Sequence, residues 1–313
     1  MSSPSLPPPG PHDHVSPDDP RAVWPYDPSF AAALLFLALF GVSTILHTVQ
    51  MFRYRKWISW VIIMSALWQV VGFVLRVLST RHQLNKGYYS ALQIVILLAP
   101  LWTNAFCYIC LGRMIGYFVP DRKLIGIRAA RFSWLWICLD FVAFVVQAIG
   151  GGMAANTGHT ASDAREVQNG LHVYMGGIAL QQFFILLFLF IAYNFQRKVS
   201  RAPASQVPPY KWRHLLYGLY GALVLITIRI IYRLVEFSGK NLTKGFVPSH
   251  EVFYYCFDAL PMLLAIWIFH VVHPGRYLVP EGRRDNAQAA SRRSESTLEK
   301  RDAEMHQAAP KAQ

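Results

Sequence analysis

Apolar and polar positions alternate along this chain in long blocks. Seven runs are apolar over ~20 residues each, the length that crosses ~30 Å of hydrocarbon as a helix, and polar loops separate them. The pattern predicts an all-α integral membrane protein built as a bundle of seven transmembrane helices. The runs cover residues 30–49, 58–78, 90–110, 132–149, 171–193, 215–235 and 252–271.

Positive charge is distributed unevenly between the two sets of loops. Lys and Arg number three, five and five in alternate loops and eight in the tail, against one, two, one and two in the other set. Because positive residues flank the cytoplasmic ends of spans, the N-terminus is predicted outside and the C-terminus in the cytoplasm. The formal net charge of +13 is therefore a topology signal, and we expect no nucleic-acid partner.

The two ends of the chain lack the apolar periodicity of its middle. Residues 1–29 are rich in proline and acidic, without the basic start and separate apolar stretch of a cleaved signal peptide. We expect a disordered extracellular segment at 1–29, a seven-transmembrane domain at 30–273 and a disordered cytoplasmic tail at 274–313. In the outer loops, Asn241-Leu242-Thr243 is predicted as a glycosylation acceptor at Asn241.

Six ionisable residues interrupt or border the apolar runs. Each costs roughly 2.5–3.5 kcal/mol at the centre of a span, so such residues usually mark a ligand pocket or a pathway. Three are basic and three acidic, so their formal charges cancel. They are Arg76, Asp140, Arg229, Arg233, Glu236 and Asp258.

Each span also carries a polar stripe, because offsets of four and seven residues return to one helical face. Gln147 shares a stripe with Asp140, and Gln181 lies on the stripe of the fifth span. Most of these residues fall toward the outer ends of their spans, with Asp140 near the middle. The arrangement predicts a polar cavity in the outer half of the bundle. The predicted substrate-binding or translocation residues are Arg76, Asp140, Gln147, Gln181, Arg229, Arg233, Glu236 and Asp258.

Two interpretations of this cavity remain open. The charges either pair only with one another and tie the helices together, or they hold the polar head of an amphipathic molecule whose tail stays among the helices. Trp24 and Tyr26, by contrast, are interpreted as parts of an interfacial aromatic belt.

Several segments in sequence order resemble the fungal lipid-translocating exporters, also called RTA-like or aminocholesterol-resistance proteins. The resemblance covers about residues 24–277. It rests on Trp24-Pro25-Tyr26-Asp27-Pro28-Ser29, Gly72 to Arg76, Ala99-Pro100, Asp140, Gln147-Ala148-Ile149-Gly150-Gly151-Gly152, Gly177 to Gln181, Arg229-Ile230-Ile231-Tyr232-Arg233 with Glu236, Glu251 with Tyr255, and Phe257-Asp258-Ala259-Leu260-Pro261.

The resemblance implies a plasma-membrane protein that exports sphingoid long-chain bases or sterol-like amines and gives resistance to toxic amphiphiles. This chain departs from the family pattern with Gln69 where a glutamate is common and Phe73 where a tyrosine is common. The departure removes a carboxylate that could pair with Arg76 or carry a proton. Proton coupling, if the family uses it, would then fall to Asp140 or Asp258.

Other functional classes fit the sequence less well. The chain has no phosphate-binding loop, so we expect no ATP hydrolysis, no cofactor and no catalytic residue. A membrane lipid amide hydrolase would need a zinc site, but Asp258 lies about 18 Å along the helix from His270, at 1.5 Å per residue. A lipid-sensing receptor remains an alternative, although rhodopsin-like motifs are absent. The sequence does not predict an oligomeric state.

Overall fold

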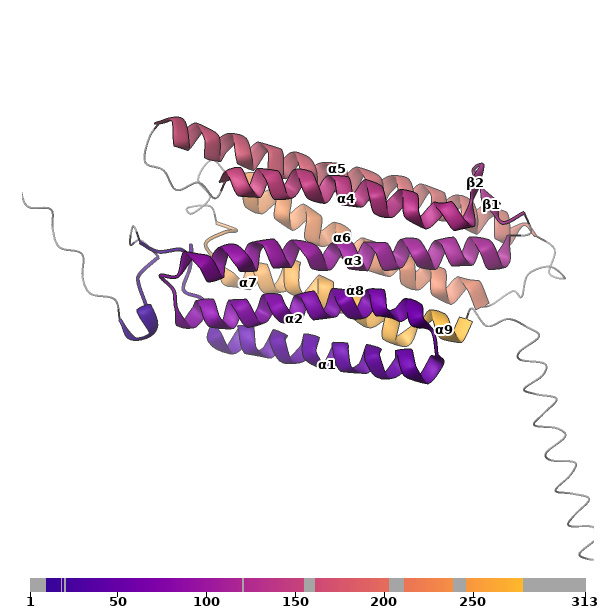
Figure 1. The fold of residues 1–313 in the computed structure, drawn as a ribbon, viewed down its shortest axis with the longest axis horizontal. Coiled ribbons are helices and arrows are strands. Elements are labelled where there is room, and N and C mark those ends of the chain that lie inside the picture. The colour runs from indigo at the N-terminus through magenta and orange to yellow at the C-terminus, as the bar shows by residue number, and fades with distance from the viewer. Residues whose placement is uncertain are drawn as a thin grey trace, which may run out of the picture.

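The computed structural model shows seven long helices packed side by side (Figure 1). Seven segments are long and apolar enough to cross a membrane, which confirms the predicted all-α seven-span bundle. The residues that the structure describes are 10–17, 19, 21–119, 121–154, 161–202, 211–238 and 246–277. Asn241 and nearly all of the predicted tail lie outside them.

Six spans are single helices and the seventh has three parts. The helices extend past most of the apolar runs. Their bounds are α1 (Phe30–Tyr54), α2 (Trp60–Arg81), α3 (Lys86–Phe118), α4 (Ala129–Ala154), α5 (Ala161–Ser200), α6 (Lys211–Ser238), α7 (Glu251–Tyr254), the π-helical turn η3 (Tyr255–Ala259) and α8 (Leu260–Val271). The shorter elements are η1 (Pro11–Asp13), η2 (Trp57–Ser59), the antiparallel hairpin of β1 (Lys123–Leu124) and β2 (Ile127–Arg128), and α9 (Pro274–Tyr277).

The wide turn η3 follows from a proline in the seventh span. Pro261 has no N–H, and in a regular α-helix its ring clashes with the carbonyl four residues earlier, at Phe257. The π-helical turn η3 ends at Ala259, two residues before Pro261, and widens the helix there. Asp258 lies within this turn and is 2% exposed. The proline therefore shapes the backbone that presents a buried carboxylate, and such turns occur frequently at functional sites.

Glycines bring the backbones of α4 and α5 into close approach. A Cβ added to Gly177 would lie 2.8 Å from the Gln147 nitrogen and 3.1 Å from the Ala143 carbonyl oxygen. At Gly150, an added Cβ would lie 2.7 Å from the Gly170 carbonyl oxygen. Small residues at such positions let membrane helices pack closely. The glycine run at 150–152 lies inside α4, which continues to Ala154.

Candidate functional site

Two arginines of α6 share one carboxylate of the seventh span. Arg229 Nε lies 2.7 Å from Asp258 Oδ1, and Arg233 Nη2 lies 2.8 Å from Asp258 Oδ2. Arg233 also donates from Nη1 to Glu236 Oε2 at 3.0 Å, while the Tyr232 hydroxyl donates to Glu236 Oε1 at 3.2 Å. We call Arg229, Arg233, Glu236 and Asp258 the α6 cluster. The two arginines and Asp258 have side chains at most 5% exposed, so each charge depends on its partner.

Arg229 also contacts α3 where a proline interrupts its hydrogen bonding. Pro100 lies inside α3 and has no N–H, so the carbonyl of Ile96 has no helical donor four residues later. Arg229 Nη2 donates to that carbonyl oxygen at 3.4 Å. The proline of α3 thus leaves an acceptor that the buried guanidinium of α6 uses.

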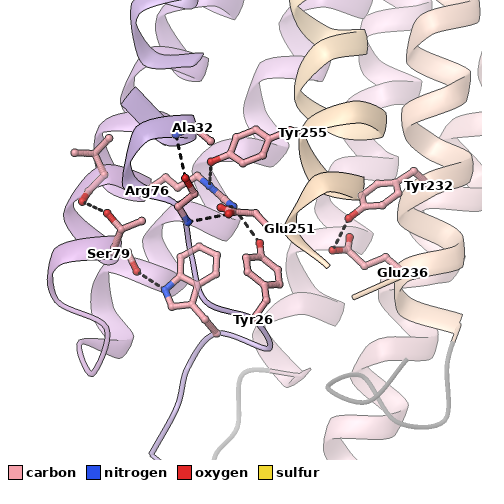
Figure 2. A network of polar contacts seen from close by, with 12 residues as sticks. Tyr26, Ala32, Arg76, Ser79, Tyr232, Glu236, Glu251 and Tyr255 are labelled. Atoms are coloured by element: carbon pink, nitrogen blue, oxygen red, sulfur yellow. Dashed lines mark hydrogen bonds and ion pairs between the residues drawn. The ribbon is translucent and has the colours of Figure 1, made fainter. Parts of the chain in front are cut away.

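Arg76 of α2 forms a second cluster with the seventh span and the segment before α1 (Figure 2). Its Nη2 lies 2.7 Å from Glu251 Oε1 and donates to the Tyr26 hydroxyl at 3.0 Å. Its Nε donates to the Tyr255 hydroxyl at 3.1 Å. The guanidinium carbon lies 4.0 Å from the ring centroid of Tyr254, within cation–π range. We call Arg76, Glu251 and these three tyrosines the Arg76 cluster.

The segment before α1 packs into this end of the bundle. Trp24 is 5% exposed, and its Nε1 donates to Ser79 Oγ at 3.1 Å. The backbone nitrogen of Ser29 donates to Glu251 Oε2 at 2.8 Å. Desolvation raises the pKa of Tyr26, so its hydroxyl is protonated at neutral pH. Trp24 and Tyr26, expected in an interfacial belt, instead cover the buried charges.

Glu251 is a charged member of the site that was not among the predicted site residues, although the family resemblance included it. The apolar run of the seventh span begins one residue after it, so it was not counted among the intramembrane charges, and Arg76 had no predicted partner. The structure supplies that partner. A signal was present in the sequence: Glu251 and Tyr255 are four residues apart, which places both on one helical face, and both contact Arg76.

The structure separates Asp140 from the other charges. Its Oδ2 accepts from Asn104 Nδ2 of α3 at 2.7 Å, and none of the ion pairs found among the described residues includes it. The six expected charges therefore do not form a single group. Including Glu251, the two clusters contain three arginines and three carboxylates, so they are neutral without Asp140.

Gln147 and Gln181 form a third, uncharged contact. Gln147 Nε2 of α4 donates to Gln181 Oε1 of α5 at 3.1 Å. The two side chains are 4% and 8% exposed. They meet beside the close approach of the two backbones at Gly177. The amide pair thus belongs to the α4–α5 interface.

A cavity of about 30 Å³ lies between the α6 and Arg76 clusters. That is room for about one water molecule. Any larger molecule could enter this cavity only if the segment before α1, or the helices, moved. Its polar lining includes Tyr26, Arg76, Tyr89, Gln93, Arg233 and Glu236. A larger hollow of about 460 Å³ lies by the β1–β2 hairpin and involves neither cluster.

Histidines gather at the opposite end of the bundle. His47 stacks on His270 with ring centroids 3.5 Å apart, and His273 Nε2 lies 2.9 Å from Ser59 Oγ. The zinc-hydrolase alternative would use these histidines with Asp258, which pairs with two arginines instead. Within the described ranges, no group of three or more His, Cys, Asp or Glu side chains could hold a metal ion.

Residues 62–281 of this chain match the family described as RTA1 like protein. The chain belongs to the RTA1-like family. It is similar to the probable lipid transporter atnI of Emericella nidulans, with 38% identity over 87% of this chain and 72% of that protein. It is also similar to the sphingoid long-chain base transporter RSB1 of Saccharomyces cerevisiae, with 24% identity over 79% of this chain and 72% of the relative.

A third relative, Protein RTM1 of Saccharomyces cerevisiae, is 32% identical over 66% of this chain and 64% of its own length. No solved structure matches the chain. The resemblance stated from sequence motifs is confirmed by the family match. The named relatives and the seven apolar helices support a lipid-related transport role for an integral membrane protein.

Proposed function

We propose that this protein exports sphingoid long-chain bases, sterol-like amines or similar toxic amphiphiles across the plasma membrane, without hydrolysing ATP itself. One observation carries the proposal: two buried, balanced charge clusters flank a small cavity at one end of an apolar bundle. Relatives named as lipid and sphingoid base transporters support the substrate class.

The carboxylates of the two clusters differ in how easily they could exchange an arginine for a head group. The side chains of Glu236 and Glu251 are 17% and 13% exposed, against 3% for Asp258. A protonated amine carries the charge of an arginine, so it can replace a guanidinium as the counter-charge of either glutamate, while the displaced arginine turns to water or to another acceptor. The alkyl tail would remain against apolar helix faces or lipid. Glu236 is the first contact in this proposal because it lines the cavity.

The N-terminal segment covers the proposed entry. Trp24 and Tyr26 contact Arg76 or its neighbour Ser79, and both line the cavity. We therefore assign the segment the role of a cover that must withdraw before a head group reaches Glu236. The observed arrangement is then the closed one.

The proposal places this end of the bundle outside the cell, following the distribution of Lys and Arg. Asn241 would then lie on the glycosylated side of the membrane. Expression in a fungal host followed by endoglycosidase treatment is expected to increase the gel mobility of the wild type but not of Asn241→Gln. A second glycosylation site can be engineered into the β1–β2 hairpin. Glycosylation there, and not at Asn241, would show the reverse orientation.

Flux in proteoliposomes tests the transport function. Purified protein is reconstituted with a fluorescent sphingoid base, and movement between leaflets is followed by quenching. The wild type is expected to exceed protein-free vesicles, and Glu236→Gln to fall well below the wild type at equal incorporation. Lys198→Ala is the matched control, because its ion pair with Asp121 is surface-exposed at the other end. Wild-type flux equal to that of empty vesicles would refute transport of this substrate.

A further inference from the structure

Asp140 is a buried carboxyl whose hydrogen bonding is incomplete. It is 1% exposed, and its Oδ2 accepts from Asn104. Among the described residues, its Oδ1 has no hydrogen-bond partner. Asn104 Oδ1 is also buried and unpartnered, and the Tyr108 hydroxyl interacts with Asp140 without making a hydrogen bond of good geometry. Polar atoms buried in a bundle are usually paired, so this group of three has unused binding capacity.

Among the described residues, no positively charged side chain pairs with Asp140. The main neighbours of α4 are α3 and α5. From α3, the titratable groups facing Asp140 are Cys107 and Tyr108, and from α5 the polar neighbour is Gln181. Arg128 of β2 also belongs to an element that contacts α4, but it is exposed and lies about 16–18 Å away along α4 by the helical rise. An ionised Asp140 would therefore be an uncompensated charge inside the bundle, which is costly.

We propose that Asp140 is a proton-binding site, separate from the two charge clusters, whose protonated form holds α3 and α4 in the closed packing observed. The added proton removes the negative charge and turns the carboxyl into a donor as well as an acceptor. Loss of the proton leaves a carboxylate that requires water, so deprotonation favours an opened, hydrated arrangement.

Coupling of this proton to lipid movement rests on the proposed function. A proton that binds from one side and leaves to the other would let a pH gradient drive transport by a chain that lacks a phosphate-binding loop. A metal ion is the competing ligand, but hard divalent cations take six or more oxygens. The oxygens without a hydrogen bond of good geometry here are those of Asp140, Asn104 and Tyr108.

The protonation state is tested first without any lipid. Infrared difference spectra of the purified protein at neutral pH are compared for the wild type, Asp140→Asn and Glu236→Gln. The wild type and Glu236→Gln are expected to show the band of a protonated carboxylic acid. Asp140→Asn, which introduces a neutral side chain of the same shape, is expected to lack it. An Asp140→Asn spectrum that lacks only a carboxylate band would overturn the proposal.

Flux under imposed gradients tests the coupling. With one-to-one coupling, a pH difference of one unit is expected to give up to about tenfold lipid accumulation in wild-type vesicles, since 1.4 kcal/mol corresponds to tenfold. Asp140→Asn is expected to equilibrate lipid but not to accumulate it. Accumulation driven equally by sodium, or unchanged in Asp140→Asn, would overturn proton coupling. Wild-type vesicles that move no lipid under any gradient would instead refute the proposed function, while the infrared result stands alone.

Discussion

Asp258→Asn is the substitution with the largest predicted effect on the α6 cluster. It removes a negative charge that faces two buried arginines at 2.7 and 2.8 Å. Arg233 keeps Glu236 as a partner at 3.0 Å. Among the described residues, the acceptor that remains to Arg229 is the Ile96 carbonyl oxygen, at 3.4 Å. The variant therefore leaves one buried guanidinium without a counter-charge.

The expected loss of stability follows from this one unpaired guanidinium. Removing one partner of a buried ion pair destabilises a protein by about 3–5 kcal/mol, because the other charge remains buried. A loss of about 4 kcal/mol lowers the ratio of folded to unfolded protein by nearly 10³. In the double variant Arg229→Met with Asp258→Asn, the orphaned charge is gone. What remains is an unpaired Ile96 carbonyl, worth about 1–3 kcal/mol, so the double variant is expected to be more stable than Asp258→Asn.

Unfolding in mixed micelles of denaturing and mild detergent measures all four members of this double-mutant cycle. The coupling free energy between Arg229 and Asp258 is expected to be favourable by at least about 1 kcal/mol. Flux is measured only on protein that elutes as a monodisperse peak, so that a loss of transport is distinguished from a loss of folded protein. Asp258→Asn within about 0.5 kcal/mol of the wild type, or a double variant less stable than the single, would refute the assignment of Asp258 as counter-ion.

Two further predictions concern the α4–α5 interface and the N-terminal cover. Gly177→Ala is expected to destabilise the bundle by about 1–3 kcal/mol through overpacking against Gln147. The matched Gly176→Ala, with nothing within 4 Å of the added Cβ, should be neutral or slightly stabilising. Equal free energies of unfolding for the two variants in mixed micelles would contradict this. Trp24→Ala is expected to expose a cysteine placed at Gln93 to a water-soluble thiol reagent several-fold faster. The control Trp57→Ala, 72% exposed at the other end, should leave that rate unchanged, and equal rates for both variants would argue against a cover.

Hydrophobic run length was enough to predict the seven spans, because a membrane helix must be apolar over a fixed length. Their positions toward the outer ends of the spans then predicted that Arg229, Arg233 and Asp258 share a polar cavity, and the structure brings them together. The same reasoning failed for Asp140. A shared polar interior does not show which carboxylate pairs with which arginine, because that choice depends on helix rotation and neighbour order.

Periodicity could not predict the site contacts made by residues outside the apolar runs. Glu251 lies at a span boundary, and Tyr26 lies in a segment without helical pattern, yet both bind Arg76. A rule based on apolar windows excludes such residues by construction. The turn η3 could not be predicted either. Pro261 indicates an irregularity in the helix, but the sequence alone does not distinguish a kink from a wide π-helical turn.

Every arginine and carboxylate of the two clusters has an ion-pair partner. This complete pairing bears on whether the clusters bind a ligand or only stabilise the bundle. A cavity of about 30 Å³ bounded by satisfied ion pairs leaves no spare charge for a head group of either sign. A cation can enter without a net cost in charge only by displacing an arginine from a carboxylate, and the released guanidinium must then find water or another partner. Arg76 and Arg233 both line the cavity and lie nearest such a route. In the proposed function, structural pairing and ligand binding are therefore two states of the same residues, and they exchange at the partly exposed glutamates, Glu236 and Glu251.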